Sequence, residues 1–194
     1  TIPFGDETAV NGWWNDAPGQ SFFAAVEEKY PKAKIIAEDL GIITDDVKEL
    51  LSDYEFPGMK MLPFAFFDEN SEYIPRNYKT ENCVVYTSSH DSDCAKSWIA
   101  ELPKYARELF DRERKKIKGE SRVYSAIRLA FESKANLAIV QMQDYLELTN
   151  DEGRMNTPSV AEGNWTWRVS PRYRTATLIE KIKSITTRTN RGAK

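Results

Sequence analysis

The sequence is poor in the residue types that hold structural metal ions and disulfide frameworks. It contains two cysteines, Cys83 and Cys94, and a single histidine, His90, among 194 residues. The cysteines do not form a CxxC motif, so no metal site is expected. Two scattered thiols are typical of a reducing cytoplasm. A disulfide between Cys83 and Cys94 is the alternative.

Long hydrophobic runs and a surplus of positive charge are also lacking. No apolar stretch approaches the ~20 residues that a membrane-spanning helix needs, and no charged-then-apolar leader opens the sequence. The net charge of −3 argues against a nucleic-acid partner. We therefore expect a cytoplasmic protein that binds neither nucleic acid nor a membrane and requires no cofactor.

Aromatic residues are comparatively plentiful. Five tryptophans, nine tyrosines and nine phenylalanines together make up 12% of the sequence. Such rings stack on sugars or bases where they are exposed, and fill cores where they are buried. The length and the hydrophobic content predict one domain with a sizeable core.

Strand-like and helix-like segments alternate along the chain. Hydrophobic spacing predicts helices at 20–30, at about 45–54 after the N-cap Thr44, at 94–118, at about 123–131 and around 178–185. Four strands are expected at 34–37, 59–67, 83–87 and 137–142, with Pro63 unfavourable inside the second. Residues 1–19, 68–81 and 150–171 are predicted to be loops. The order predicts an α/β fold with a parallel sheet.

Two of the predicted strands deliver an acid where their apolar run stops. Glu38 follows Ile35-Ile36-Ala37, and Asp91 follows the run that begins at Val84. In parallel α/β folds, binding and catalysis concentrate at the carboxyl ends of the strands. We therefore expect Glu38 and Asp91 to face a shared cleft. The plainer alternative is that Glu38 and Asp39 are loop acids and that Asp91 caps the next helix.

Five short motifs, together with a segment near the start, resemble the 4-α-glucanotransferases (amylomaltase or disproportionating enzyme), a branch of the α-amylase-like glycosidases. The motifs are, in order, Ala37-Glu38-Asp39-Leu40-Gly41, Pro57-Gly58-Met59-Lys60, Ser89-His90-Asp91, Arg154-Met155-Asn156-Thr157-Pro158 and Asn164-Trp165-Thr166-Trp167-Arg168, and the earlier segment is Thr8-Ala9-Val10-Asn11-Gly12 with Trp14. The similarity covers nearly the whole chain.

The resemblance implies retaining transfer of α-1,4-glucan segments between maltooligosaccharides through a covalent glycosyl-enzyme intermediate. By motif, Glu38 matches the general acid/base and Asp91 the carboxylate that stabilises the transition state. Asp39 and His90 match sugar ligands.

Further residues are weaker candidates. Trp14 is either a sugar platform or a core residue, and His90 has a structural role as its alternative. Asn156 and Asn164 are expected to contact sugar from a loop over the rim. Trp165 and Trp167 are expected to pack, while Gln143 and Asp144 are rim candidates at the end of the last strand.

The departures from the family pattern are as informative as the matches. The family's nucleophile is an aspartate at the end of the fourth strand, upstream of the motif that begins here at Thr8, and no acid of this sequence takes its place. The resemblance therefore implies that residues 1–194 form one partial catalytic domain. It would be the second half of a (β/α)8 (TIM) barrel, from the fifth strand of the barrel to its eighth helix, with residues 1–19 as a loop before the first helix of the chain. Such a chain is expected to be inactive alone, and either to self-associate through its open sheet edges or to fold poorly.

Two other functions stay open at this stage. One is an α-glucan hydrolase of the same clan, with water as the acceptor. The other is a non-catalytic glucan-binding module, in which aromatic side chains rather than carboxylates determine affinity.

Overall fold

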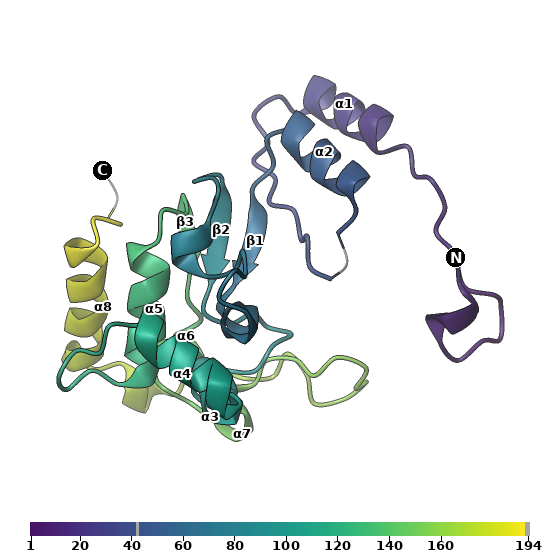
Figure 1. Cartoon of the computed structure of the whole chain (residues 1–194). Helices are drawn as coiled ribbons and strands as arrows, with labels where there is room; N and C mark the ends of the chain where they lie inside the picture. Colours follow the sequence, from purple (N-terminus) through teal and green to yellow (C-terminus); the bar gives the residue numbers. More distant parts are fainter. Residues whose placement is uncertain (42, 193–194) are drawn as a thin grey trace.

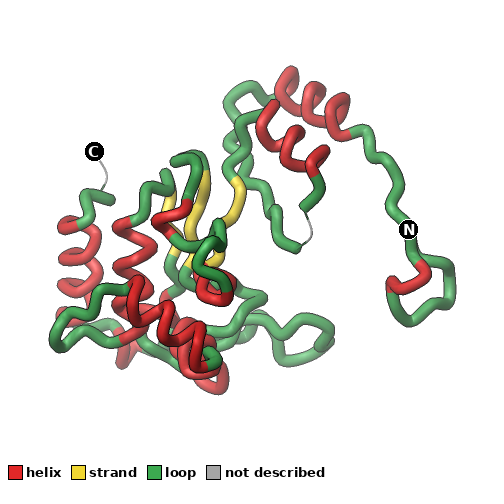
Figure 2. The backbone as a smooth tube through the Cα atoms, in the orientation of Figure 1, coloured by secondary structure: helices red, strands yellow, loops and turns green. Residues whose placement is uncertain are grey.

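The computed structural model describes residues 1–41 and 43–192 and contains a parallel sheet flanked by helices (Figures 1 and 2). The strands are β1 (Gly58–Met61), β2 (Cys83–Tyr86) and β3 (Leu137–Ile139), in the order β1-β2-β3. Both pairings are parallel, with Met61 opposite Tyr86 and Tyr86 opposite Ile139. The predicted α/β class is confirmed.

The prediction of a strand at 34–37 is wrong, because these residues do not join the sheet as a strand. The Ala37 N–H donates to the Pro57 carbonyl (3.0 Å), so the segment lies against the start of β1. One such bond does not make a ladder. Within the described residues the sheet therefore has three strands instead of four.

Two other predicted strands are shorter than expected. The strand predicted at 59–67 ends at Met61, and Leu62–Phe67 form the 3-10 helix η2. Proline at 63 removes a backbone donor and starts this helix. The strand predicted at 137–142 ends at Ile139, because Met142–Tyr145 already form α6.

Most of the predicted helices are present. The helices are α1 (Gly19–Lys29), α2 (Asp45–Asp53), α3 (Ala95–Glu101), α4 (Lys104–Glu113), α5 (Arg122–Glu132), α6, α7 (Asn150–Gly153) and α8 (Ala176–Arg188). Pro103 divides the helix predicted at 94–118 into α3 and α4, since proline suits a helix start better than its interior. The short helix α7 interrupts the loop predicted at 150–171. Short 3-10 turns occur at η1 (Ala9–Asn11), η3 (Pro75–Asn77) and η4 (Pro171–Tyr173).

The core lies between one face of the sheet and helices α3 to α5. Val85 of β2 belongs to a buried cluster with residues of η2, α3, α4 and α5. At its centre, the rings of Phe66, Trp98 and Phe110 lie 4.9–6.1 Å apart. This burial supplies the largest favourable term for folding.

The opposite face of the sheet is less covered. Val84 and Leu137 are register partners, as are Tyr86 and Ile139, so these four side chains share that face. Val84 is fully buried, but Leu137 and Ile139 at the β3 edge are 50% and 40% exposed.

The basic run 112–116 is only partly exposed to solvent. Arg112 is exposed and pairs with Glu69 (2.9 Å). Arg114, however, is buried, and its guanidinium donates to Asp111 (2.6 Å) and to the Ser125 hydroxyl (3.1 Å).

Helices α1 and α2 form a pair outside the main core (Figure 1). The ring of Phe23 contacts those of Tyr54 and Phe56 at 5.4 and 4.8 Å. The segment before α1 runs away from the sheet and ends in a separate loop (Figure 1).

Both cysteines are free and buried, so the alternative of a Cys83–Cys94 disulfide is wrong. No helix in the described part of the chain has the length and apolarity to cross a membrane.

Candidate active site

Glu38 lies in the extended segment beside β1, and its side chain is exposed. Burial, and after it the negative charge of Glu38, raises the pKa of the Tyr86 phenol. Tyr86 is the last residue of β2, so Glu38 lies within electrostatic range of the carboxyl end of the central strand. This is the end of the sheet from which the loop carrying Asp91 starts.

Asp39 is bound to the backbone of β1. Its Oδ1 accepts a hydrogen bond from the Met59 N–H (2.6 Å). A Cβ at position 58 would lie 2.2 Å from its Oδ2, so Gly58 is what lets the carboxylate come this close. In the structure, the partner of the Asp39 carboxylate is therefore the backbone of β1. A contact of Asp39 with sugar stays a prediction.

Asp91 lies in the segment between β2 and α3, and two side groups orient its carboxylate. The His90 Nε2 is 3.2 Å from Asp91 Oδ2, and the Asn156 amide donates to Asp91 Oδ1 (2.5 Å). The Asn156 N–H also donates to the His90 carbonyl (3.2 Å). We call His90, Asp91 and Asn156 the Asp91 cluster. The side chains of His90 and Asp91 are 51% and 48% exposed, so both remain accessible to a ligand.

Trp165, which the sequence analysis expected to pack, lies beside the Asp91 cluster. Its ring lies 5.1 Å from that of His90 at an angle of 40°, and it is 55% exposed. The Trp165 N–H donates to the Met155 carbonyl (2.8 Å), and its φ is +63°, an uncommon value for a large residue. A tryptophan in a motif shared with a sugar-transferring family was the available signal. Trp167 is partly buried, and its indole N–H donates to the Glu152 carbonyl (3.0 Å).

Asn164 follows Asn156 of the Asp91 cluster by eight positions. Its side-chain amide, however, binds the backbone of the loop 157–164. The Asn164 Oδ1 accepts from the Thr157 N–H (2.9 Å), and its Nδ2 donates to the Val160 carbonyl (2.7 Å). A sugar contact of this amide stays a prediction.

Trp14 is not brought to the Asp91 cluster. Its side chain is 96% exposed, on the segment that runs away from the sheet (Figure 1). The alternative of a core residue is therefore wrong.

The rim candidates at the end of the last strand lie beneath the surface. Asp144 is 0% and Gln143 3% exposed, so the expectation that they face the rim is wrong. The Gln143 amide donates to the Gly153 carbonyl (3.1 Å), which fixes the end of α7. Both residues belong to α6, whose side chains turn toward the core.

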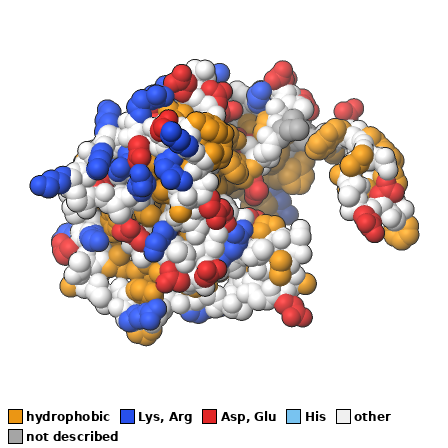
Figure 3. Space-filling view, turned by 60° about the horizontal axis from the view of Figure 1, so that its bottom comes forward, with side chains coloured by type: hydrophobic (Ala, Val, Ile, Leu, Met, Phe, Trp, Pro, Cys, Tyr) orange, Lys and Arg blue, Asp and Glu red, His pale blue; other side chains and the backbone are white. Residues whose placement is uncertain are grey.

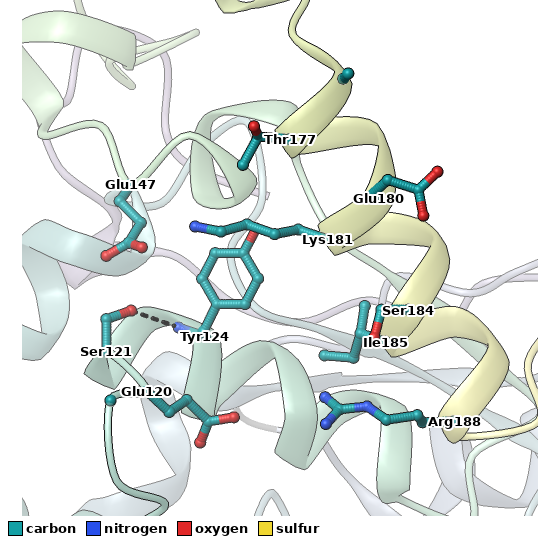
Figure 4. A pocket seen from close by; sticks show the side chains of 12 residues that line it. Glu120, Ser121, Tyr124, Glu147, Thr177, Glu180, Lys181, Ser184, Ile185 and Arg188 are labelled. Carbon is teal, nitrogen blue, oxygen red and sulfur yellow. Dashed lines mark hydrogen bonds between the residues drawn. The ribbon is translucent and has the colours of Figure 1, made fainter.

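Two cavities lie away from the Asp91 cluster. One, of about 700 Å³, is lined by residues of α5 and α8 (Figure 4). There the Lys181 ammonium lies 4.9 Å from the centre of the Tyr124 ring. In that cavity, Ser121 accepts the hydrogen bond from the Tyr124 N–H that the figure marks. The other, about 510 Å³, is lined at the amino ends of the strands by residues such as Ile36, Pro57 and Leu137.

Within residues 1–41 and 43–192, no group of three or more His, Cys, Asp or Glu side chains is placed to hold a metal ion. The Asp91 cluster offers one carboxylate, an imidazole and an amide, and the indole face of Trp165 lies beside it. Such a set is suited to binding hydroxyl groups and the apolar face of a sugar ring.

The chain is similar to known proteins over most of its length. A family model described as "4-alpha-glucanotransferase" matches residues 1–175. A 4-alpha-glucanotransferase of Aquifex aeolicus is 44% identical over 173 residues, and one of Streptococcus pneumoniae is 40% identical over 187 residues. These alignments cover 89% and 96% of this chain but 35% and 37% of the relatives, so the chain spans just over a third of their length.

A solved structure shows the same likeness in three dimensions. Amylomaltase from Streptococcus agalactiae in complex with acarbose superposes with a TM-score of 0.92 at 35% sequence identity. The match covers 99% of this chain and 39% of that one. On the family match, the sequence identities and this superposition, the chain belongs to the 4-alpha-glucanotransferase family.

Proposed function

We propose that this chain supplies two carboxylates to a retaining 4-α-glucanotransferase that transfers α-1,4-glucan segments between maltooligosaccharides. In retaining chemistry one carboxylate attacks the anomeric carbon, and a second, roughly 5–5.5 Å away, protonates the leaving oxygen and later activates the acceptor. Glu38 takes the acid/base role. Asp91 binds hydroxyls of the distorted sugar and stabilises the positive charge of the transition state.

The observation that supports this proposal most is the Asp91 cluster. The hydrogen bond from Asn156 and the adjacent imidazole hold the carboxylate in one orientation while it is still half exposed. A charge fixed before the sugar arrives stabilises developing charge without reorganisation. The half-exposed ring of Trp165 beside His90 adds a face on which a pyranose can stack.

The proposal includes inactivity of the 194-residue chain by itself. No acid in it matches the family's nucleophile, so we propose that the chain corresponds to the second half of a (β/α)8 barrel. Glu38 and Asp91 then act only together with a carboxylate from the preceding strands. The proposed location is the cytoplasm, although a relative from Solanum tuberosum is named chloroplastic/amyloplastic.

Binding of acarbose tests the proposed site directly. The related amylomaltase was solved with this compound, so we expect the chain to bind it. Asp91→Asn should weaken binding at least about tenfold, since a hydrogen bond to a charged group is worth roughly 1.5–3 kcal/mol. Glu101→Gln, an exposed acid at the end of α3, is the matched control and should bind like the parent. Equal affinities of parent and Asp91→Asn would contradict the assignment.

Incubation with maltotriose tests the reaction and separates the alternatives. We expect neither glucose nor longer maltooligosaccharides from the pure chain. Chain extension would overturn the proposed inactivity, and glucose without extension would favour a hydrolase. Glucan affinity that survives Glu38→Gln but is lost in Trp14→Ala would favour a binding module.

A further inference from the structure

The segment that carries His90 and Asp91 is attached at both ends to one buried carboxylate. At its start, the hydroxyls of Thr87 and Ser88 each donate to Asp144 Oδ2 at 2.5 Å. At its end, the N–H of Ala95, the first residue of α3, donates to Asp144 Oδ1 (2.7 Å). Asp144 itself has no solvent exposure.

Neighbouring groups strengthen the same attachment. The Gln141 amide, at the start of α6, donates to the Ser88 hydroxyl (2.7 Å) and to the Ser89 carbonyl (2.8 Å). The Trp98 indole N–H donates to the Thr87 carbonyl (3.0 Å). Hydrogen bonds from the start of α6 and from α3 therefore fix the residues just after β2.

We propose that Asp144 is a positioning residue for His90 and Asp91. This inference rests on the proposed function and deepens it. Asp144 lies beneath the rim and does not touch the substrate. Its role is to fix where the segment 88–94 leaves the sheet and where it enters α3, and thereby the orientation of the Asp91 carboxylate.

The acceptor chemistry of Asp144 explains why a carboxylate is required at this position. All three partners donate to it, and the Ser88 hydroxyl also accepts a hydrogen bond from the Gln141 amide. A carboxylate accepts every one of these bonds, whereas an amide turns one N–H₂ group toward a donor. An asparagine that still accepts from the Ala95 N–H turns its N–H₂ group toward Thr87 and Ser88, so both hydroxyls must become acceptors and their buried O–H groups lose the carboxylate as a partner.

His90 is the only histidine in the sequence and gives a single-residue reporter of this effect. The experiment compares parent, Asp144→Asn and Ser125→Ala by the NMR signals of the His90 ring, by thermal unfolding and by acarbose binding. Ser125 is an equally buried hydrogen-bonding residue on α5, bound to Arg114 and Glu120 rather than to the segment 88–94. It serves as the control for a loss of stability alone.

We expect both variants to unfold at lower temperature. Only Asp144→Asn should shift or broaden the His90 ring signals and weaken acarbose binding about tenfold, because small displacements of a positioned group are costly. Unchanged His90 signals and unchanged affinity in a folded Asp144→Asn protein would overturn the inference.

A milder variant covers the case in which Asp144→Asn does not fold. Thr87→Val keeps the shape but removes one donor to Asp144, and it should shift the His90 signals by a smaller amount. Identical His90 signals in Thr87→Val and Ser125→Ala would then overturn the inference. If the parent fails to bind acarbose, the proposed function fails, while the His90 signals still decide whether Asp144 positions the segment.

Discussion

At position 58 the backbone of β1 passes so close to Asp39 that a side chain does not fit. A Cβ there would lie 2.2 Å from one carboxylate oxygen and 2.8 Å from its carbon. The carboxylate is the movable partner, so a larger residue displaces it from the Met59 N–H. The glycine of this motif is thus explained by the position of its neighbour rather than by its own backbone conformation.

We therefore expect Gly58→Ala to lower the free energy of unfolding by about 1 kcal/mol or more, through loss of the Asp39–Met59 hydrogen bond. Urea denaturation measures this change. Gly192→Ala is the control, because a Cβ at that position meets nothing within 4 Å. Equal losses in the two variants would contradict this explanation of Gly58.

The ion pairs of Asp111 should make the free energy of unfolding sensitive to acid. Hydrogen bonds from Arg122 and from Arg114 lower its pKa from 3.8 to about 2. A lowered pKa of an acid stabilises the folded state above the unfolded value, and this stabilisation is lost as the pH falls through the folded value. The window for Asp111 thus runs from pH 3.8 down to about 2.

In this window the parent should lose more unfolding free energy than Asp111→Asn, as urea titrations at several pH values can measure. Arg122→Gln removes the main cause of the pKa shift and should narrow the window. Parallel pH profiles of parent and Asp111→Asn would refute the assignment.

Among the helices, α5 and α8 have the same kind of N-terminal cap but differ in burial. The Ser121 hydroxyl accepts from the Tyr124 N–H at the start of α5, and Thr175 accepts from the Leu178 N–H at the start of α8. Seven residues of α5 are buried, whereas α8 buries Ile185. Beyond α8, the Arg191 guanidinium donates to the Phe131 and Ala135 carbonyls, which attaches the end of α8 to the end of α5.

We predict that Ser121→Ala lowers the global free energy of unfolding by about 1 kcal/mol, the usual value of a helix cap. Thr175→Ala should instead increase hydrogen exchange in the first turn of α8 and change global stability less. Urea denaturation combined with amide exchange separates the two effects. A larger global loss in Thr175→Ala than in Ser121→Ala would show that α8 belongs to the cooperative core.

Helix α5 and the segment 34–37 show how far local patterns determine the elements. The spacing of Val123, Ile127 and Phe131 predicted α5 almost to its ends, because one apolar stripe suffices to define an amphipathic helix. The strand at 34–37 was predicted from the same kind of apolar run, and it failed. A strand needs hydrogen-bond partners on another segment, which its own residues cannot reveal.

At the scale of the whole molecule, the sheet is well covered on one face only. Leu137 and Ile139 at the β3 edge are exposed, and Figure 3 shows further hydrophobic side chains on the body and on the projecting N-terminal segment. Ile2, Phe4, Val10, Trp13 and Trp14 of that segment are all at least half exposed. Exposed apolar surface next to a strand edge favours association with another chain.

We expect the 194-residue chain to self-associate through the β3 edge and the adjacent face of the sheet. Sedimentation should show dimers or larger species for the parent and a shift toward monomer for Ile139→Lys. Ile179→Lys, on the outer side of α8 where the side chain is 62% exposed, is the control and should remain associated. A stable, well-folded parent monomer would contradict this expectation.

The sequence by itself determined the α/β class, the family and most helix positions, because amphipathic spacing and short motifs are local properties. Only the tertiary structure decided which side chains meet. It brings Asn156 onto Asp91 across 65 positions, turns Asp144 into the core and leaves Trp14 in solvent. These outcomes depend on contacts between segments that lie far apart in the sequence. No local pattern encodes that packing, since burial and long-range hydrogen bonds are properties of the folded chain as a whole.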